Sequence, residues 1–534
     1  MDNTEQPNVL IFITDQHRAD YLGCYGHPVL ETPNIDSIAK RGKRFDRFYV
    51  ANPVCMPNRA TIMTGRMPSA HGVRSNGINL SLQSSTFVDL LRRQGYQTAL
   101  VGKSHLQNIE SIPALYQPPE PAPGALKPPA ALREARMAGT SDEGYGQEET
   151  GQWQANPDRQ ISLPYYGFEQ VQLCIGHGDQ VVGHYEPWLN ARVKDAARLR
   201  DPANALEHEY ICPQAVRTAV PEELYPTAFI TEKAQEAITA YAQNRDKPFL
   251  LTVSFPDPHH PFTPPGRYWD KYSPDDMVLP ESFFNEEPPA SVRHVWDKRI
   301  NGQANPNGHG ALAVNEQELR EAMALTCGMI SMIDDAVGRI MSTLETNGLS
   351  KNTIVIFTSD HGDLMGDHRL ILKGPLHFQS LIRVPFIWAD CNENVVPGAV
   401  NALTSSVDIA RSILERVGCA PYFGIQGRSL MPHINDLPGD ERNALLIESE
   451  DQRPYYSLQA APTRLRTLVT QRWRLTLVHT GTWGELYDLE NDPHELVNRW
   501  DDPGYRRVRG ELCEQLAYEQ MAAADFTPLP TRQA

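Results

Sequence analysis

The sequence lacks any long uninterrupted apolar run. No window reaches the roughly 18 consecutive apolar residues that a membrane-spanning helix needs. The first residues, MDNTEQPNVLIFITDQ, contain neither the basic segment nor the small-residue cleavage site that is typical of a secretory signal. Basic residues are also outnumbered, because 49 Lys and Arg stand against 66 Asp and Glu and give a formal net charge of −17. We therefore expect a cytoplasmic protein that binds no membrane and, since phosphates would meet net repulsion, no nucleic acid.

Cysteines are few and scattered. The eight Cys residues show no paired spacing of the kind that zinc sites have. We expect them to be reduced and mostly buried, with Cys55 as an exception that is considered below. A chain of 534 residues can bury a large core, and its length predicts one large α/β domain with an appendage, or two to three domains.

Four short apolar runs have the length and composition of strands that are buried on both faces of a parallel sheet. They span residues 8–14, 98–102, 249–255 and 353–358. Polar residues follow each run, and the carboxyl ends of strands are where open α/β sheets place their ligand crevice. Apolar residues at helical spacing predict helices at 33–41, 86–94, 228–242, 316–346 and 406–417. The expected fold class is α/β, with a doubly wound mixed sheet flanked by helices.

Two other segments differ in composition. Residues from about 110 to 226 are rich in Pro, Gly and charge, which predicts a long irregular insertion over the crevice. Such loops usually select the substrate. From about residue 440, short alternating stretches that include 465–470, 473–479 and 485–488 predict a small antiparallel sheet, followed by a helix at 505–522. The predicted organisation is a catalytic domain at 1–437 and a smaller α+β subdomain with a tail at 438–534.

Asp360 and His361 in SDHG, together with Asp15 in DQ, form a candidate metal site. Carboxylate oxygens and an imidazole from separate strand ends can converge on one divalent cation. Loop capping is the ordinary role of any single Asp at such a position. Two such motifs after two buried strands nevertheless favour metal binding.

Cys55 precedes a predicted helix in NPVCMPNRATIMTGR. Pro57 could preset the turn into this helix. A thiolate at that point would be stabilised by the helix N-terminus and by Arg59, so the cysteine could be reactive. A buried structural thiol explains the local features about equally well, because free cysteine is among the most buried residue types.

Over most of its length the chain resembles the sulfatase family. CMPNRATIMTGR is similar to the family signature CxPxR followed by TGR. Seven other blocks occur in the family order: DQHRADYLGCYG, TPNIDSIAKRG, GKSHL, PHHPF, TSDHGDLMGDH, RVPFIW and ELYDLENDPHE. The resemblance implies an alkaline-phosphatase-like α/β fold with a smaller C-terminal subdomain, and oxidation of Cys55 to formylglycine by a maturation enzyme.

The resemblance also implies a set of metal ligands. They would be Asp15, Gln16, Asp360 and His361, together with an oxygen of the modified Cys55. Many sulfatases have a second acid at the position of Gln16 and bind calcium. The amide of Gln16 removes negative charge and His361 adds nitrogen, so both Ca²⁺ and Mn²⁺ stay open as the cation.

Five basic residues would act on the substrate by the same resemblance. Arg59 would orient the nucleophile. Lys103 and His105 in GKSHL would bind the sulfate and assist the aldehyde hydrate. His259 and Lys373 would lie near the leaving oxygen, with His259 as general acid and Lys373 also gripping the sulfate.

Some positions depart from the family pattern. Asn58 stands where many members have Ser or Ala, and GPLHFQS follows Lys373 where relatives often show Tyr-Glu. The second departure leaves the leaving-group side of the pocket undefined. We expect His260 to be an ordinary solvated side chain, and His368 and His377 to be structural rather than part of the crevice.

The implied function is the hydrolysis of sulfate monoesters to an alcohol or phenol and inorganic sulfate. A formylglycine hydrate would be the nucleophile and a divalent metal would favour its ionised form. The alternative is a phosphonate monoester or phosphodiester hydrolase of the same superfamily, although such enzymes carry neutral hydroxyl residues at the Lys103 and His105 positions. A hydrolase with unmodified Cys55 and a catalytically silent binding protein are further possibilities. The expected partners are a small sulfate ester, the formylglycine-generating enzyme and further copies of the chain in a homo-oligomer.

Overall fold

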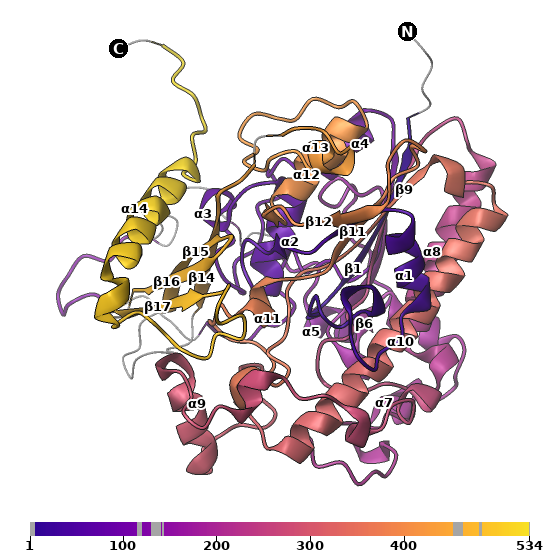
Figure 1. The fold of residues 1–534 in the computed structure, drawn as a ribbon. Helices are drawn as coiled ribbons and strands as arrows, with labels where there is room; N and C mark the ends of the chain where they lie inside the picture. Colours follow the sequence, from indigo (N-terminus) through magenta and orange to yellow (C-terminus); the bar gives the residue numbers. More distant parts are fainter. Residues whose placement is uncertain are drawn as a thin grey trace.

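A nine-stranded mixed sheet forms the centre of the computed structural model (Figure 1), in the order β12-β2-β11-β9-β1-β7-β4-β5-β6. Its middle strands β9 (Thr353–Ser359), β1 (Asn8–Thr14), β7 (Phe249–Ser254) and β4 (Gln97–Gly102) are parallel. Their carboxyl ends therefore open on the same edge of the sheet. The structure describes residues 6–114, 120–129, 140, 144–439, 441–451, 463–479 and 483–532.

Shorter strands complete both sides of this sheet. β5 (Gln170–Ile175) pairs in parallel with β4, and β6 (Val182–Gly183) runs antiparallel to β5. On the other side β11 (Phe386–Ala389) is antiparallel to both β9 and β2 (Lys43–Phe45), and β12 (Gly398–Val400) is parallel to β2. The predicted α/β class with a mixed sheet is confirmed.

Helices cover both faces of the sheet, which explains why every residue of β1, β7 and β9 is buried. Alternate residues of β1 point to opposite sides. Val9, Ile11 and Ile13 pack in one core with α4 (Phe87–Arg93) and α12 (Asp408–Arg416). Leu10 and Phe12 pack in a second core with α8 (Pro226–Gln243) and α10 (Glu316–Thr346).

The long helix α10 has the predicted bounds because its first turn is strongly capped. Asn315 Oδ1 accepts the backbone N–H of Glu318 at 2.9 Å, and Glu318 Oε2 accepts that of Asn315 at 2.9 Å. This reciprocal pair is a capping box, which satisfies two backbone donors at the helix start. The remaining helices are α1 (Pro33–Lys40), α2 (Cys55–Thr64), α3 (Pro68–His71), α5 (Thr150–Ala155), α6 (Tyr185–Asn190), α7 (Ala196–Arg200), α9 (Ala290–Ile300), α11 (Gln379–Ile382) and α13 (Met431–Ile434).

A four-stranded antiparallel sheet with one helix lies beside the central sheet (Figure 1). Its strands are β14 (Ala444–Asp451), β15 (Thr463–Thr470), β16 (Trp473–Val478) and β17 (Trp483–Asp488), and its helix is α14 (Arg506–Ala522). Leu446, Leu468 and Leu475 pack against Leu512 and Leu516 of this helix. The sequence predicted the last three strands and the helix, but not β14. Two small sheets complete the fold: β3 (Phe48–Tyr49) with β13 (Thr404–Ser405), and β8 (Leu312–Ala313) with β10 (Leu370–Ile371).

Residues 110–226 are less irregular than predicted. They contain β5 and β6 of the central sheet as well as three short helices, so the expectation of an insertion without regular structure is wrong in part. The strand was missed because its first residue, Gln170, is exposed and Gln172 is only partly buried, which breaks the apolar run. Among the described residues, no helix combines the length and apolar character needed to cross a membrane.

Candidate active site

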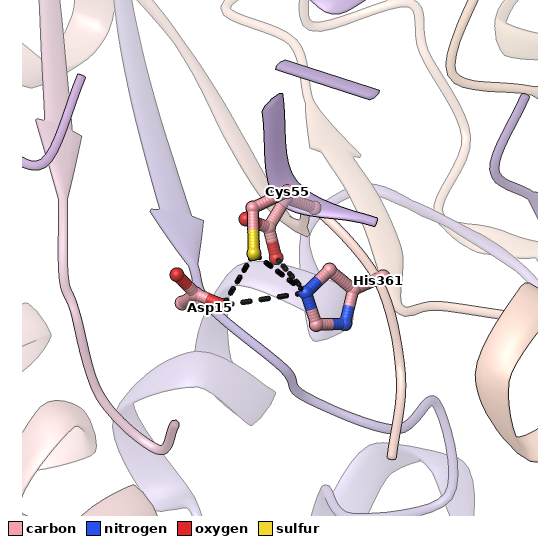
Figure 2. Close-up of side chains that lie close together, drawn as sticks. Asp15, Cys55 and His361 are labelled. Atoms are coloured by element: carbon pink, nitrogen blue, oxygen red, sulfur yellow. Dashed lines mark hydrogen bonds and ion pairs between the residues drawn. The ribbon is translucent and has the colours of Figure 1, made fainter. Parts of the chain in front are cut away.

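Cys55 is the first residue of α2 and lies in a polar cluster at the carboxyl ends of β1 and β9 (Figure 2). Its Sγ is 3.1 Å from His361 Nε2 and 3.8 Å from Asp15 Oδ1. Lys373 Nζ approaches the same sulfur at 2.9 Å. Burial and Asp15 raise the pKa of the thiol, but Lys373 and His361 outweigh them, so that its pKa is lowered. Cys55 is therefore buried among charges rather than among apolar side chains, which favours the reactive interpretation.

Four buried side chains offer ligand atoms within 4.8 Å of one another: Asp15, Cys55, Asp360 and His361. β1 and β9 are neighbouring strands, so the residues that follow them meet at the sheet edge. His361 Nδ1 donates to the carbonyl of Gly362 at 2.8 Å. This hydrogen bond places a proton on Nδ1, so Nε2 would be the metal-binding atom, and it lies 3.4 Å from Asp15 Oδ1 and 3.0 Å from Lys373 Nζ.

Gln16, which follows Asp15, offers a further oxygen. Its Oε1 is buried and has no hydrogen-bond partner among the described residues, and its backbone N–H donates to Asp360 Oδ1 at 3.2 Å. A buried polar atom without a partner is destabilising, and a cation beside two carboxylates would satisfy this oxygen. Two carboxylates, an amide oxygen and an imidazole thus fit a divalent cation. Cys55 Sγ stands in for the oxygen that oxidation of this residue would provide.

Cations balance the two carboxylates. Arg59 Nε donates to Asp360 Oδ2 at 2.7 Å, and a second nitrogen of its guanidinium donates to Ser254 Oγ at 2.9 Å. Lys103 Nζ donates to Asp15 Oδ2. Burial alone would raise the pKa of Asp15, but Lys103, Lys373 and Arg59 hold it well below its usual range. Asp15 is therefore ionised at neutral pH.

Lys373 Nζ, which contacts Cys55, also lies 3.0 Å from His259 Nε2. His259 Nδ1 donates to the carbonyl of His260 at 2.5 Å, so Nε2 is the atom that accepts from Lys373. Burial, together with the nearby rings and Lys373, holds the pKa of His259 well below its usual range. In this pair Lys373 carries the proton. Burial and Lys103 likewise lower the pKa of His105, whose Nδ1 has no partner among the described residues.

Sequence reasoning missed two residues of the 110–226 segment. His177 follows β5, and its Nε2 lies 2.7 Å from Lys103 Nζ. Glu148 accepts the backbone N–H groups of His105 at 2.6 Å and of Leu106 at 3.0 Å, and so holds the loop that carries His105. The shorter apolar run LCI before Gly-His ends at a polar residue as the other strands do, and this weaker signal could have identified His177.

A cavity of about 480 Å³ opens over this cluster. Its polar lining includes Cys55, His105, His177, His259 and Lys373, and its apolar lining includes Val54, Met56 and Ile109. Glu450 and Asp451 of β14 complete the lining from the C-terminal sheet. The structure brings every predicted site residue into one cluster: Asp15, Gln16, Cys55, Arg59, Lys103, His105, His259, Asp360, His361 and Lys373. The roles of these residues stay predictions.

The three remaining histidines considered from the sequence are all buried. His260 was expected to be solvated, but its Nδ1 lies 3.1 Å from Gln16 Nε2. The His368 ring packs against Phe378 at a tilt of 42°, with ring centroids 4.3 Å apart. His377 Nδ1 lies 2.7 Å from Thr467 Oγ1 of β15 and so joins the central fold to the C-terminal sheet.

Comparison with known families decides the assignment. The family model "Sulfatase" matches residues 7–119 and 125–419. The chain belongs to the sulfatase family. A second model, "N-sulphoglucosamine sulphohydrolase, C-terminal", matches residues 366–522 of this sulfatase. This range includes the four-stranded antiparallel sheet and α14.

Individual relatives cover nearly the whole sulfatase. The multifunctional alkaline phosphatase superfamily protein PehA of Trinickia caryophylli is 27% identical over 541 residues, covering 97% of this chain and 96% of that protein. The arylsulfatase of Clostridium perfringens is 26% identical, covering 94% and 92% respectively. The crystal structure of the phosphonate monoester hydrolase of Agrobacterium radiobacter superposes with a TM-score of 0.76 at 25% identity. The match covers 99% of this chain and 98% of that protein. The predicted alkaline-phosphatase-like fold and the predicted class, a sulfuric ester hydrolase, are confirmed.

Proposed function

We propose that this sulfatase hydrolyses sulfate monoesters through a formylglycine formed from Cys55 and one divalent cation, Ca²⁺ or Mn²⁺. The position of Cys55 carries this proposal. Its Sγ lies 3.1 Å from His361 Nε2, a proposed metal ligand, and 2.9 Å from Lys373 Nζ, which would bind the sulfate. A nucleophile at this point would contact both the cation and the sulfate.

The two added groups would supply specific chemistry. Formylglycine as its hydrate would provide the attacking hydroxyl, and the cation would favour the ionised form of that hydroxyl and withdraw charge from the sulfate. The ligands would be Asp15, Gln16, Asp360, His361 and the modified residue 55. Maturation would require a formylglycine-generating enzyme as a partner.

The side chains of the protein would stabilise charge and move protons. Lys103 and Lys373 would bind the sulfate oxygens that gain charge in the transition state, in a buried site where fixed cations act strongly. Lys373 and His259, 3.0 Å apart, would protonate the departing oxygen, with Lys373 as the group that holds the proton at rest. His105 is neutral because its pKa is lowered by burial and Lys103, so it can accept the proton that is released from residue 55 in the second half of the reaction.

Phosphonate monoester or phosphodiester hydrolysis is the second candidate. The 25% identity and the superposition with a phosphonate monoester hydrolase favour it. Lys103 and His105 favour sulfate esters, because the family resemblance implies neutral hydroxyl groups at these two positions in phosphonate hydrolases. We therefore expect sulfate monoesters to be the preferred substrates and the other esters to react more slowly at the same site.

Two measurements test the proposal. Mass spectrometry of the tryptic peptide that contains residue 55 should show the aldehyde in active protein, and Cys55→Ser should fold but lose nearly all multiple turnover. Sulfate, phosphonate and phosphodiester substrates that share one leaving group should then be compared by kcat/KM. Full turnover by Cys55→Ser would contradict the nucleophile, and faster turnover of the phosphonate ester would assign the enzyme to the second candidate.

A further inference from the structure

Two acceptors hold the side-chain nitrogen of Gln16. Nε2 donates to Asp363 Oδ2, and it lies 3.1 Å from His260 Nδ1. An amide nitrogen has two N–H groups and no lone pair to offer, so His260 Nδ1 must be the acceptor in the second contact. Both donors of the amide are therefore used, and Oε1 is left without a hydrogen-bond partner among the described residues. A half-turn of the amide would lose the hydrogen bond to Asp363 Oδ2 and set Oε1 against that carboxylate oxygen, and it would keep a contact to His260 only if that ring moved its proton to Nδ1.

Asp363 cannot adjust to a reversed amide, because the backbone fixes its carboxylate. Its Oδ1 accepts the N–H groups of Met365 at 2.6 Å and of Leu372 at 3.0 Å. Only Oδ2 can then face Gln16. Both Asp363 and His260 are almost fully buried, so water cannot replace either acceptor without entering the cluster.

We propose that Asp363 and His260 are positioning residues that fix the polarity of the Gln16 amide, so that Oε1 rather than Nε2 faces the divalent cation. The inference rests on the proposed metal site. A reversed amide would direct two N–H groups at the cation and remove one oxygen ligand. An acid at position 16 would need no such control, because its two oxygens are equivalent. The two acceptors would thus allow an amide to serve at a position where, by the family resemblance, many sulfatases have a carboxylate.

Asp363→Asn tests the inference on metal affinity. The backbone N–H groups of Met365 and Leu372 would retain the oxygen of the introduced amide, so its nitrogen would face Gln16 Nε2. Two donors would then oppose each other, and Gln16 would turn to present Oε1 to the introduced nitrogen. We expect the Kd for Ca²⁺ and for Mn²⁺, measured by calorimetry on the purified unmodified chain, to rise by about 10- to 100-fold.

A second substitution should reverse this loss. Gln16→Glu combined with Asp363→Asn pairs a carboxylate with an amide donor and leaves one carboxylate oxygen for the cation. We expect the double variant to bind both metals within the wild-type range, whereas Gln16→Glu alone places two carboxylates against each other and binds more weakly than the double variant. An equal loss from Asp363→Asn in both backgrounds would overturn the inference.

Two further variants keep the result interpretable. His260→Phe removes the other acceptor without affecting the turn that Asp363 holds, and it should weaken metal binding in the same direction even if Asp363→Asn does not fold. Asp334→Asn is the matched control, since Asp334 is a buried carboxylate that accepts from Asn34 and Ile35 outside the site, and its metal Kd should not change.

The calorimetry requires no turnover. A protein that binds cations but cleaves no sulfate ester would disprove the proposed function and leave this inference standing. A wild-type chain that binds neither cation, or metal Kd values unchanged in both Asp363→Asn and His260→Phe, would overturn it.

Discussion

His177 Nε2 lies 2.7 Å from Lys103 Nζ, and its ring stacks on that of His259 with centroids 3.7 Å apart. Burial and Lys103 hold the pKa of His177 well below its usual range, so the ring is neutral and Nε2 accepts a hydrogen bond from the ammonium group. His177 thus orients the Lys103 ammonium group, which should bind the sulfate. His177 belongs to the 110–226 segment, which the sequence predicted to select the substrate.

His177→Ala should lower kcat/KM for sulfate esters by about 10- to 100-fold, the effect of losing one hydrogen bond to a charged group. If His177 acts through Lys103, the same substitution in a Lys103→Ala background should have almost no further effect. His177→Asn, which keeps an acceptor, should recover part of the rate. Additive losses in the double variant, measured with one aryl sulfate, would contradict this coupling.

Lys103→Ala and His105→Ala should each lower sulfate turnover by about 10² or more, the usual loss for one electrostatic or proton-transfer contributor. The effect on phosphonate esters should be smaller, because basic residues at these positions distinguish the two proposed substrate classes. Steady-state kinetics with esters of one leaving group provide the measurement, and Lys40→Ala at an exposed position is the control. Unchanged sulfate turnover in both variants would count against sulfate as the preferred substrate.

Asp360→Ala should abolish activity and reduce bound metal. The substitution removes one of two carboxylates from the cluster and leaves the Arg59 guanidinium without its 2.7 Å partner. Metal content by plasma mass spectrometry, normalised to protein, is the readout, and circular dichroism checks folding. Stoichiometric metal in a folded Asp360→Ala protein would show that Asp360 is not a ligand.

The strands and the site residues that follow them could be predicted for one physical reason. Strands buried on both faces have to be continuous apolar runs, and β1, β7 and β9 are entirely buried, so the end of each run is visible in the sequence. Asp15 and Asp360 were found in this way. The family resemblance added Cys55 and its oxidation, which the local sequence left undecided.

Residues that act through other side chains could not be found by this reasoning. Asp363 and His260 matter because of contacts to Gln16 that join positions 347 and 244 residues apart in the chain. β14 was overlooked because its residues 448–451 are the acidic and polar run ESED, yet seven of the eight residues of β14 are buried. Glu450 forms ion pairs with Arg74 and Arg464, and Glu448 forms one with Arg466. A local sequence pattern cannot predict such tertiary contacts.

The stability of the protein should depend on pH through His377. Burial, with Arg474 and Arg466 nearby, lowers the pKa of His377 to about 3, whereas the unfolded chain should show the ordinary value of about 6.5. Between these values the unfolded state binds more protons, so the free energy of unfolding falls as the pH drops from about 6.5 toward 3, by up to about 1.4 kcal/mol per pH unit.

His377→Gln keeps a polar partner for Thr467 but cannot be protonated, and it should therefore lose less stability on acidification than the wild type. Urea unfolding at pH 7.5 and pH 5 measures the difference between the two proteins. Equal acid sensitivity of both would show that His377 is not the titrating group. The other buried histidines are common to both proteins and cancel in the comparison.

The residues that bury Cys55 lie far toward the C-terminus and are therefore synthesised long after it. His361 and Lys373 contact its sulfur from positions 306 and 318 residues further along, and β14 joins the same loop through a 2.9 Å hydrogen bond from the Glu448 N–H to the Ala51 carbonyl. During translation position 55 leaves the ribosome well before these residues exist. An enzyme that oxidises Cys55 would have free access in that interval and lose it once the chain folds, so maturation and folding would compete in time. Slower synthesis or folding would then raise the fraction of active protein, and a molecule that folded first would stay inactive.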